Sequence, residues 1–171
     1  FADQVAPLIE PDDAVWVHDY HLIPLGERLR SRGLKNRIGF FLHIPWPPTR
    51  LFVSLPYHER LVRTLLYYDV VGFQTQEWLE SFLHYCEHEL GAEVDGAKGT
   101  VSFEGRTTIA RAYPIGIDWD HFSQLGSAGE ARQAQQRLLS SSRRRTAMIG
   151  VDRLDYSKGI PERIDGIGRF F

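Results

Sequence analysis

The stretch AVWVHDYHLIPLGERLRSRGLKNRIGFFLHIPWPP, residues 14–48, holds two short apolar segments with an amphipathic segment between them. Residues 14–17 and 38–42 are apolar runs of strand length. The second run is continuous in its apolarity, as expected of a strand that is covered on both faces. Residues 22–32 predict a helix, with Pro24 in its first turn and a glycine just past its end. A strand, a crossover helix and a second strand together indicate a parallel sheet.

The same alternation continues along the chain, so the expected fold class is α/β with flanking helices on a Rossmann-like sheet. The further expected elements are a helix over 58–67, a strand over 70–73, a helix capped by Thr75 and running to about 90, a hairpin over 99–112, a helix over 130–139 and a strand over 147–151.

The composition changes after Asp118 toward Ser, Gln, Ala and Arg, and we place a domain boundary near Phe122. Residues 1–122 then form the C-terminal part of one Rossmann-like domain. Residues 123–171 form a linker and the first βα unit of a second domain that is only begun. A lone unit of that size cannot bury its apolar faces. Since the chain starts at Phe1 and ends inside a helical pattern, we expect it to be excerpted from a longer protein.

The composition excludes several classes of protein. With 43% hydrophobic and 25% charged residues the chain is globular, and its formal net charge of -2 gives no field that would gather nucleic acid or an anionic membrane. The single cysteine, Cys86, cannot form an internal disulfide, and no secretion leader or long apolar run is present. We therefore expect a cytoplasmic protein whose partners are small molecules.

The segment GVDRLDYSKGIPE, residues 150–162, has the composition of a phosphate-binding loop. Arg153 and Lys158 supply two cations, and Pro161 starts a helix whose free N–H groups face the loop. These features suit a diphosphate. The alternative is an Arg–Asp ion pair within the loop and a solvated lysine.

Polar side chains follow the first two expected strands, Asp19 after one and His43 after the other. Because the carboxyl ends of parallel strands share one edge of the sheet, Asp19 and His43 are expected to meet over one substrate. A carboxylate can accept hydrogen bonds from sugar hydroxyls, and the stiff loop 45–48 would hold His43 in one orientation. In the alternative, Asp19 caps the following helix and His43 lies in the core.

Three further patterns are interpreted as structural. HYCEH, residues 84–88, matches a zinc motif, but His84 and Glu87 would face solvent and no third ligand is evident. The Asp118-Trp119-Asp120 pattern is expected to cap a helix, and residues 140–145 are expected to be a solvated linker.

The chain resembles the trehalose-6-phosphate synthase family along nearly its whole length. The segments that carry the resemblance, in the family's order and at similar spacing, are VWVHDYHLIPL (15–25), RIGFFLHIPWP (37–47), YYDVVGFQT (67–75), AYPIGID (112–118) and VDRLDYSKGIPER (151–163).

The resemblance implies a two-domain GT-B fold and a retaining glycosyltransferase that transfers glucose from UDP-glucose to glucose 6-phosphate. Carried over by motif, Arg153 and Lys158 would bind the donor's diphosphate, Asp19 would bind the acceptor sugar, and His43 would contact the donor glucose at the reacting face. Asp19 and His43 are then the expected catalytic residues. No metal or other cofactor is implied, and a homo-oligomer is left open.

The family's glycine-rich loop and its acidic donor ligands would lie before Phe1 and after Phe171 respectively, so this chain alone is expected to turn over no substrate. Two alternatives stay open. One is a sister glycosyltransferase with another acceptor, such as a glucosylglycerol-phosphate synthase, and the other is a non-catalytic binding or regulatory module.

Overall fold

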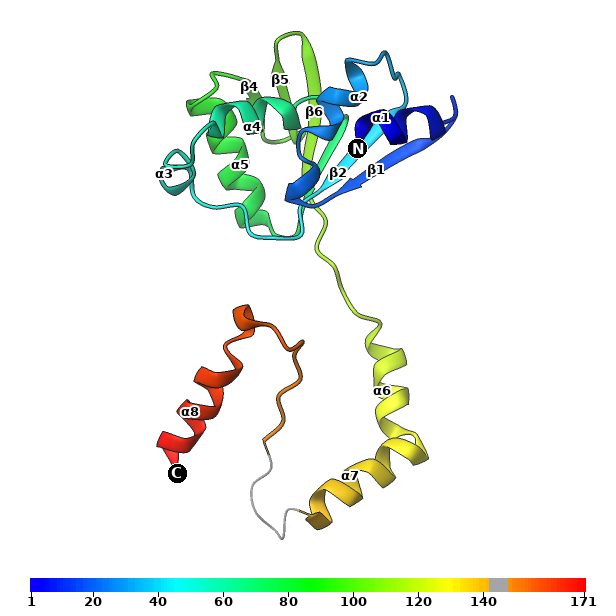
Figure 1. Cartoon of the computed structure of the whole chain (residues 1–171), viewed down its shortest axis with the longest axis vertical. Helices are drawn as coiled ribbons and strands as arrows, with labels where there is room; N and C mark the ends of the chain where they lie inside the picture. Colours follow the sequence, from blue (N-terminus) through cyan, green and yellow to red (C-terminus); the bar gives the residue numbers. More distant parts are fainter. Residues whose placement is uncertain (142–147) are drawn as a thin grey trace. The chain divides into compact units, whose positions relative to one another are not determined.

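The computed structural model describes residues 1–141 and 148–171 (Figure 1). These residues divide into two compact units, Phe1–Gly116 and Ile117–Phe171, and each is described by itself. Phe122, near which the sequence places a domain boundary, lies inside a helix of the second unit. Among the described helices, none is long and apolar enough to cross a membrane.

The first unit is built on a six-stranded sheet in the order β1-β2-β3-β6-β5-β4 (Figure 1). Its strands are β1 (Ala14–His18), β2 (Arg37–Phe41), β3 (Val70–Phe73), β4 (Glu93–Asp95), β5 (Thr100–Phe103) and β6 (Arg106–Ala112). Strands β1, β2, β3 and β6 are parallel to one another, whereas β5 is antiparallel to both β6 and β4. The α/β prediction and the expected hairpin are therefore confirmed.

Helical segments connect these strands. They are α1 (Ala2–Val5), η1 (Ala6–Leu8), η2 (Tyr20–Leu22), α2 (Leu25–Arg30), α3 (Thr49–Phe52), α4 (His58–Leu65) and α5 (Gln76–His88). The helix expected over 22–32 is shorter, because a 3-10 turn occupies its beginning and Pro24 precedes its first residue. The Thr75 cap is confirmed: its hydroxyl accepts a hydrogen bond from the Trp78 amide.

The buried core lies on one face of the sheet. Its strand residues alternate with exposed ones and include Val17, Ile38, Phe40, Val71, Phe73 and Ala110. The other face, which we call the open face, carries Trp16 and Tyr113, exposed by 70% and 48%. A hollow of about 440 Å³ lies there. The expectation that the strand over 38–42 is covered on both faces is wrong for the described residues, because the connecting helices pack on one face and Gly39 and Phe41 line the hollow on the other.

Tyr68 joins the beginning of β3 to the segment that follows β1. Its ring is almost fully buried, and its hydroxyl donates to the carbonyl of Leu22 at 2.8 Å and accepts from the amide of Gly26 at 2.9 Å. A Cβ on Gly26 would lie only 2.8 Å from the Tyr68 ring, so this position needs glycine. The contact fixes the path of the chain immediately after the end of β1.

The second unit contains α6 (Trp119–Ser127), α7 (Gly129–Ser141), η3 (Tyr156–Lys158) and α8 (Ile160–Phe170). The helix expected over 130–139 is confirmed, whereas most of the linker expected over 140–145 lies outside the described residues. The strand expected over 147–151 is wrong for residues 148–151, which belong to no helix or strand. A strand needs a neighbour to accept its backbone hydrogen bonds, and the described part of this unit offers none.

Candidate active site

The carboxyl ends of β1 and β2 lie side by side. His18 is paired with Phe41 in the parallel register, and the amide of Asp19 donates to the carbonyl of Phe41 at 2.9 Å. Leu42, the residue after β2, donates its amide to the carbonyl of Gly72 in β3 at 3.0 Å. The chain segments that carry Asp19 and His43 therefore leave the same edge of the sheet from adjacent strands, as the sequence predicted.

Asp19 has an uncommon backbone conformation, with φ 68° and ψ 164°. A non-glycine residue at positive φ costs about 1–3 kcal/mol and is held there by its surroundings. Its Oδ1 accepts from the amide of Tyr20 at 3.0 Å, so Asp19 caps η2 as the structural alternative proposed. That single bond leaves Oδ2 without a hydrogen bond among the described residues. Capping and ligand binding are thus compatible at Asp19.

His43 is exposed, so the alternative of a histidine satisfied in the core is wrong. Its Nε2 lies 2.9 Å from Nδ1 of His18, at hydrogen-bond distance. The ring of Phe41 lies against it, with centroids 4.8 Å apart. His43 therefore lies at the surface just after the end of β2, and its ring contacts those of His18 and Phe41.

The loop after His43 is neither helix nor strand, as its prolines require. It is anchored by Trp46, which is only 3% exposed and packs on Phe52, Phe73 and Phe82. Among the described residues, the Nε1–H of Trp46 is a buried donor without a hydrogen-bond partner. The tryptophan fixes the far end of the loop, and the strand fixes its beginning.

In the second unit, the segment 152–163 forms a turn that leads into a helix. Asp155 caps η3, because its Oδ1 accepts from both the amide and the hydroxyl of Ser157, at 2.9 and 2.8 Å. These hydrogen bonds, and then the charges of Arg153 and Lys158, lower the pKa of Asp155. Gly159, at φ 59°, then reverses the chain into α8. The loop followed by a helix N-terminus is confirmed.

Neither aspartate of this loop pairs with Arg153. Asp152 instead forms an ion pair with Arg163 of α8 at 2.5 Å, and Asp155 is engaged by Ser157. Among the described residues, the side chains of Arg153 and Lys158 form no ion pair, and both are exposed. The two cations are available to an anionic ligand. That they meet Asp19 and His43 over one ligand stays a prediction, because the two pairs belong to different units.

The profile of glycosyltransferase family 20 matches residues 1–171. This chain belongs to glycosyltransferase family 20. It is 47% identical over 171 residues to a trehalose-6-phosphate synthase of Sinorhizobium fredii, covering 99% of this chain and 36% of that protein. It is 40% identical to a trehalose-6-phosphate synthase of Enterobacter over 168 residues, which are 98% of this chain and 35% of that protein.

Solved structures agree with this assignment. An α,α-trehalose-phosphate synthase (UDP-forming) of Burkholderia xenovorans, in complex with glucose-6-phosphate, is 43% identical with a TM-score of 0.86, over 98% of this chain and 37% of that one. An E. coli structure described as trehalose-6-phosphate bound with UDP-2-fluoro glucose is 39% identical with a TM-score of 0.80, over 95% and 36% of the two chains. This chain therefore spans about 36% of the length of the curated relatives that it matches.

The segment 84–88, which matches a zinc motif, makes local contacts within the first unit. Nδ1 of His84 lies 3.0 Å from the hydroxyl of Thr49, and the His84 ring stacks on His88. Among the described residues, no group of three or more His, Cys, Asp or Glu side chains could hold a metal.

Asp118 caps α6 by accepting from the His121 amide at 2.9 Å, as predicted. Cys86 is buried, which raises the pKa of its thiol.

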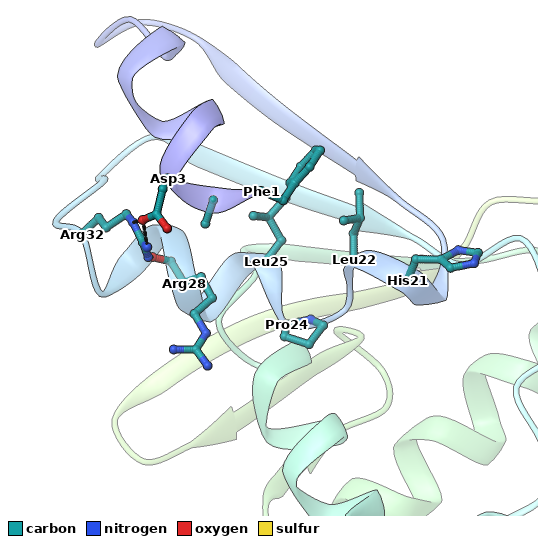
Figure 2. A pocket seen from close by; sticks show the side chains of 9 residues that line it. Phe1, Asp3, His21, Leu22, Pro24, Leu25, Arg28 and Arg32 are labelled. Carbon is teal, nitrogen blue, oxygen red and sulfur yellow. Dashed lines mark hydrogen bonds and ion pairs between the residues drawn. The ribbon is translucent and has the colours of Figure 1, made fainter.

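A second hollow, of about 370 Å³, lies between α1 and α2. Figure 2 shows the ion pair of Asp3 and Arg32 at one end of this hollow and His21 at the other. Its lining is largely apolar and includes none of the predicted site residues Asp19, His43, Arg153 and Lys158. We therefore do not place the chemistry there.

The sequence analysis did not predict the contact between His18, the last residue of β1, and His43. A signal was present: His18 and His43 each lie at the end of an apolar run, and adjacent parallel strands bring such ends together.

Proposed function

We propose that the protein to which this chain belongs is a retaining glycosyltransferase that transfers glucose from UDP-glucose to glucose 6-phosphate. Its products are then α,α-trehalose 6-phosphate and UDP. The observation that carries this proposal is the 47% identity over 171 residues to a trehalose-6-phosphate synthase. Further support comes from the relatives described as UDP-forming and as complexes with glucose-6-phosphate and UDP-2-fluoro glucose.

In this proposal Arg153 and Lys158 bind the diphosphate of the donor. Their side chains are exposed and lie beside a turn that leads into α8, whose first residues include Pro161. The N-terminus of a helix attracts anions through its free N–H groups, and two cations add charge-assisted hydrogen bonds. As the bond to glucose breaks, negative charge grows on the departing UDP, and these groups stabilise it.

Asp19 and His43 take the sugar side of the reaction. The free Oδ2 of Asp19 is suited to accept from hydroxyls of the acceptor sugar, and His43 contacts the donor glucose at the reacting face. Leaving and attacking groups are proposed to use the same face of the sugar, so the pair of carboxylates typical of glycosidases is not required. The two cations take the role that a metal has in other phosphate chemistry, and no cofactor is proposed.

The division of labour between the two units can be tested in the full-length protein. Replacing Lys158→Ala should weaken UDP binding by about 1.5–3 kcal/mol, the usual worth of a charge-assisted hydrogen bond. Replacing Asp19→Ala should impair use of glucose 6-phosphate and leave UDP affinity nearly unchanged. Isothermal titration with UDP and initial rates against glucose 6-phosphate measure both effects.

Lys98→Ala is the matched control, because Lys98 is an exposed lysine of the β4–β5 turn that pairs only with Asp95 among the described residues. It should change neither quantity. Equal losses of UDP affinity in Lys158→Ala and Asp19→Ala would contradict the proposal. Offering glycerol 3-phosphate in place of glucose 6-phosphate distinguishes a sister enzyme, and no turnover with either acceptor would favour a binding module.

Two further points belong to the same proposal. We expect the chain of 171 residues to release no UDP from UDP-glucose by itself, which a coupled assay measures against a buffer control. We also assign the protein to the cytoplasm. The support is Cys86, the single cysteine of this chain, which is buried and free of a disulfide, as is usual for proteins of a reducing compartment.

A further inference from the structure

His18 and His43 form a pair of imidazole rings at the edge of the sheet. His18 is the last residue of β1, and His43 lies two residues beyond the end of β2. The distance between Nδ1 of His18 and Nε2 of His43 is 2.9 Å, and the ring centroids are 5.2 Å apart with an interplanar angle of 27°. The two rings therefore lie edge to edge in nearly parallel planes, with their nitrogens at hydrogen-bond distance.

The surroundings of the pair restrict both rings. Trp16, two residues before His18 on the same strand, stacks on the His18 ring at 5.6 Å and 6°. Phe41 contacts the other ring, that of His43, and its backbone is paired with His18 in the register of β1 and β2. Both histidines are exposed, so water competes for their bond. The ring stacking and the strand register supply the order that an exposed hydrogen bond alone would not.

The hydrogen bond has a consequence for the chemistry of His43. A bond between two neutral imidazoles needs an N–H on one ring and a lone pair on the other. Nε2 of His43 is committed to His18 in either case, so Nδ1 is the ring nitrogen left for a ligand. The bond also couples the tautomers of the two rings. If Nε2 of His43 donates, Nδ1 keeps a lone pair, and if Nε2 accepts, Nδ1 carries the proton.

We propose that His18 is a positioning residue, which holds the ring of His43 in one orientation and one tautomer so that Nδ1 is presented to the sugar. This inference rests on the proposed function only in naming the donor glucose as the ligand of His43. His18 acts through His43 and does not contact the reacting atoms. Orientation of this kind matters because a displacement of about 1 Å at a reacting centre costs about a hundredfold in rate.

The first experiment examines the pair itself in this chain, without any substrate. The ring nitrogens of histidine are labelled with 15N and their tautomers are read by long-range 1H–15N NMR at a pH where both rings are neutral. His18→Phe keeps a flat ring on Trp16 but has no nitrogen, whereas His18→Asn places an amide group where Nδ1 lies. A His43→Asn sample assigns the His43 signals.

The wild-type chain and His18→Asn should each show a single tautomer at His43, and His18→Phe should show a mixture. His88→Gln, at the exposed end of α5, is the matched control and should leave the His43 signals unchanged. A mixture of tautomers in the wild-type chain, or His43 signals that are identical in wild type and His18→Phe, would overturn the inference. The far-UV circular dichroism of each variant verifies that it is folded.

The second experiment uses the full-length enzyme. We expect His18→Phe to lower kcat by about tenfold to a hundredfold, with unchanged KM for glucose 6-phosphate and unchanged UDP affinity, and His18→Asn to restore most of kcat. A merely structural role would predict equal losses in both variants, and that result would overturn the inference. A wild-type protein that forms no trehalose 6-phosphate would refute the proposed function instead, and the NMR result would still decide the pairing.

Discussion

The two units of this chain hold their candidate site residues by different means. In Phe1–Gly116, Asp19 and His43 follow the ends of β1 and β2. One face of this sheet packs on a continuous core in which Val71, Phe73 and Phe82 are fully buried. In Ile117–Phe171, none of the described residues is buried, and large apolar side chains are exposed. Position is therefore set by tertiary packing in the first unit and by local hydrogen bonds in the second.

The difference is visible at the two turns that the sequence picked out. Asp19 keeps a strained φ of 68° because the strand register and the Tyr68 contacts fix the chain on either side of it. The turn at 155–159 instead relies on Asp155 and Gly159, whose preferences are satisfied within a few residues. Substitutions that remove packing contacts should therefore lower the free energy of unfolding much more in the first unit than in the second.

The largest expected effect concerns a core side chain of the first unit. Phe82 is fully buried and its ring contacts those of Trp46 and Phe73. Phe82→Ala should lower the free energy of unfolding by about 3–5 kcal/mol, because it removes apolar contacts and leaves a cavity. Urea unfolding of the chain, followed by circular dichroism, measures the change.

Phe170→Ala is the matched substitution in the second unit. Phe170 is 81% exposed, so its truncation should change the free energy of unfolding by no more than about 0.5 kcal/mol. Similar losses for the two variants would break the comparison, since they would mean that the second unit buries Phe170 against something in solution.

The sequence predicted those elements whose signals are local. The strand Val70–Phe73 and the Thr75 cap agree with the structure because an apolar run and a capping hydroxyl act within a few residues. The strand expected over 147–151 has a similar apolar pattern but no neighbouring strand in the described part of its unit. An apolar pattern shows that a segment can form a strand, but the strand forms only where a neighbouring strand can pair with it.

The candidate site shows the same limit. Asp19 and His43 could be chosen from the sequence because each follows an apolar run, and the structure places their strand ends side by side. The bond between His18 and His43 depends on the register of β1 against β2, which no local pattern states. The open face with Trp16 was also not foreseen, because a continuous apolar run does not reveal which face is left uncovered.

An effect of intermediate size is expected when glycine is replaced by alanine. The substitution should lower stability in the first unit and raise the stability of a helix in the second. In Gly26→Ala the new Cβ would clash with the buried ring of Tyr68, and unfolding should become easier by about 1–3 kcal/mol. In Gly166→Ala, within α8, no atom lies within 4 Å of the new Cβ, and alanine favours the helix by up to about 1 kcal/mol.

Urea unfolding reports on Gly26→Ala, and the helical signal of the chain at low temperature reports on Gly166→Ala. The first variant should lose stability while the second gains helix. If Gly26→Ala were as stable as wild type, Tyr68 would have to move freely, and the packing that fixes the chain after Asp19 would be looser than its contacts indicate.

The smallest effect concerns two half-buried aspartates in similar turns, one in each unit. Asp95 accepts hydrogen bonds from Lys98 in the β4–β5 turn, and Asp155 accepts them from Ser157. In both, these hydrogen bonds lower the pKa below the usual 3.8 of aspartate. A lowered pKa means that each bond stabilises its turn at neutral pH, and that this contribution is lost as the pH falls from the ordinary value through the lowered one.

Carboxyl 13C NMR titration of the chain gives both pKa values, and each should lie below the ordinary value, with Asp155 returning toward it in Ser157→Ala. The sheet holds the turn of Asp95, so its low pKa should survive in any folded sample. Asp155 has only its own turn to order it. A low pKa of Asp155 means that the loop proposed to bind the diphosphate is formed without a ligand. An ordinary pKa of Asp155, with a low pKa of Asp95, means that the proposed ligand would have to order Arg153 and Lys158 and would bind more weakly for that reason.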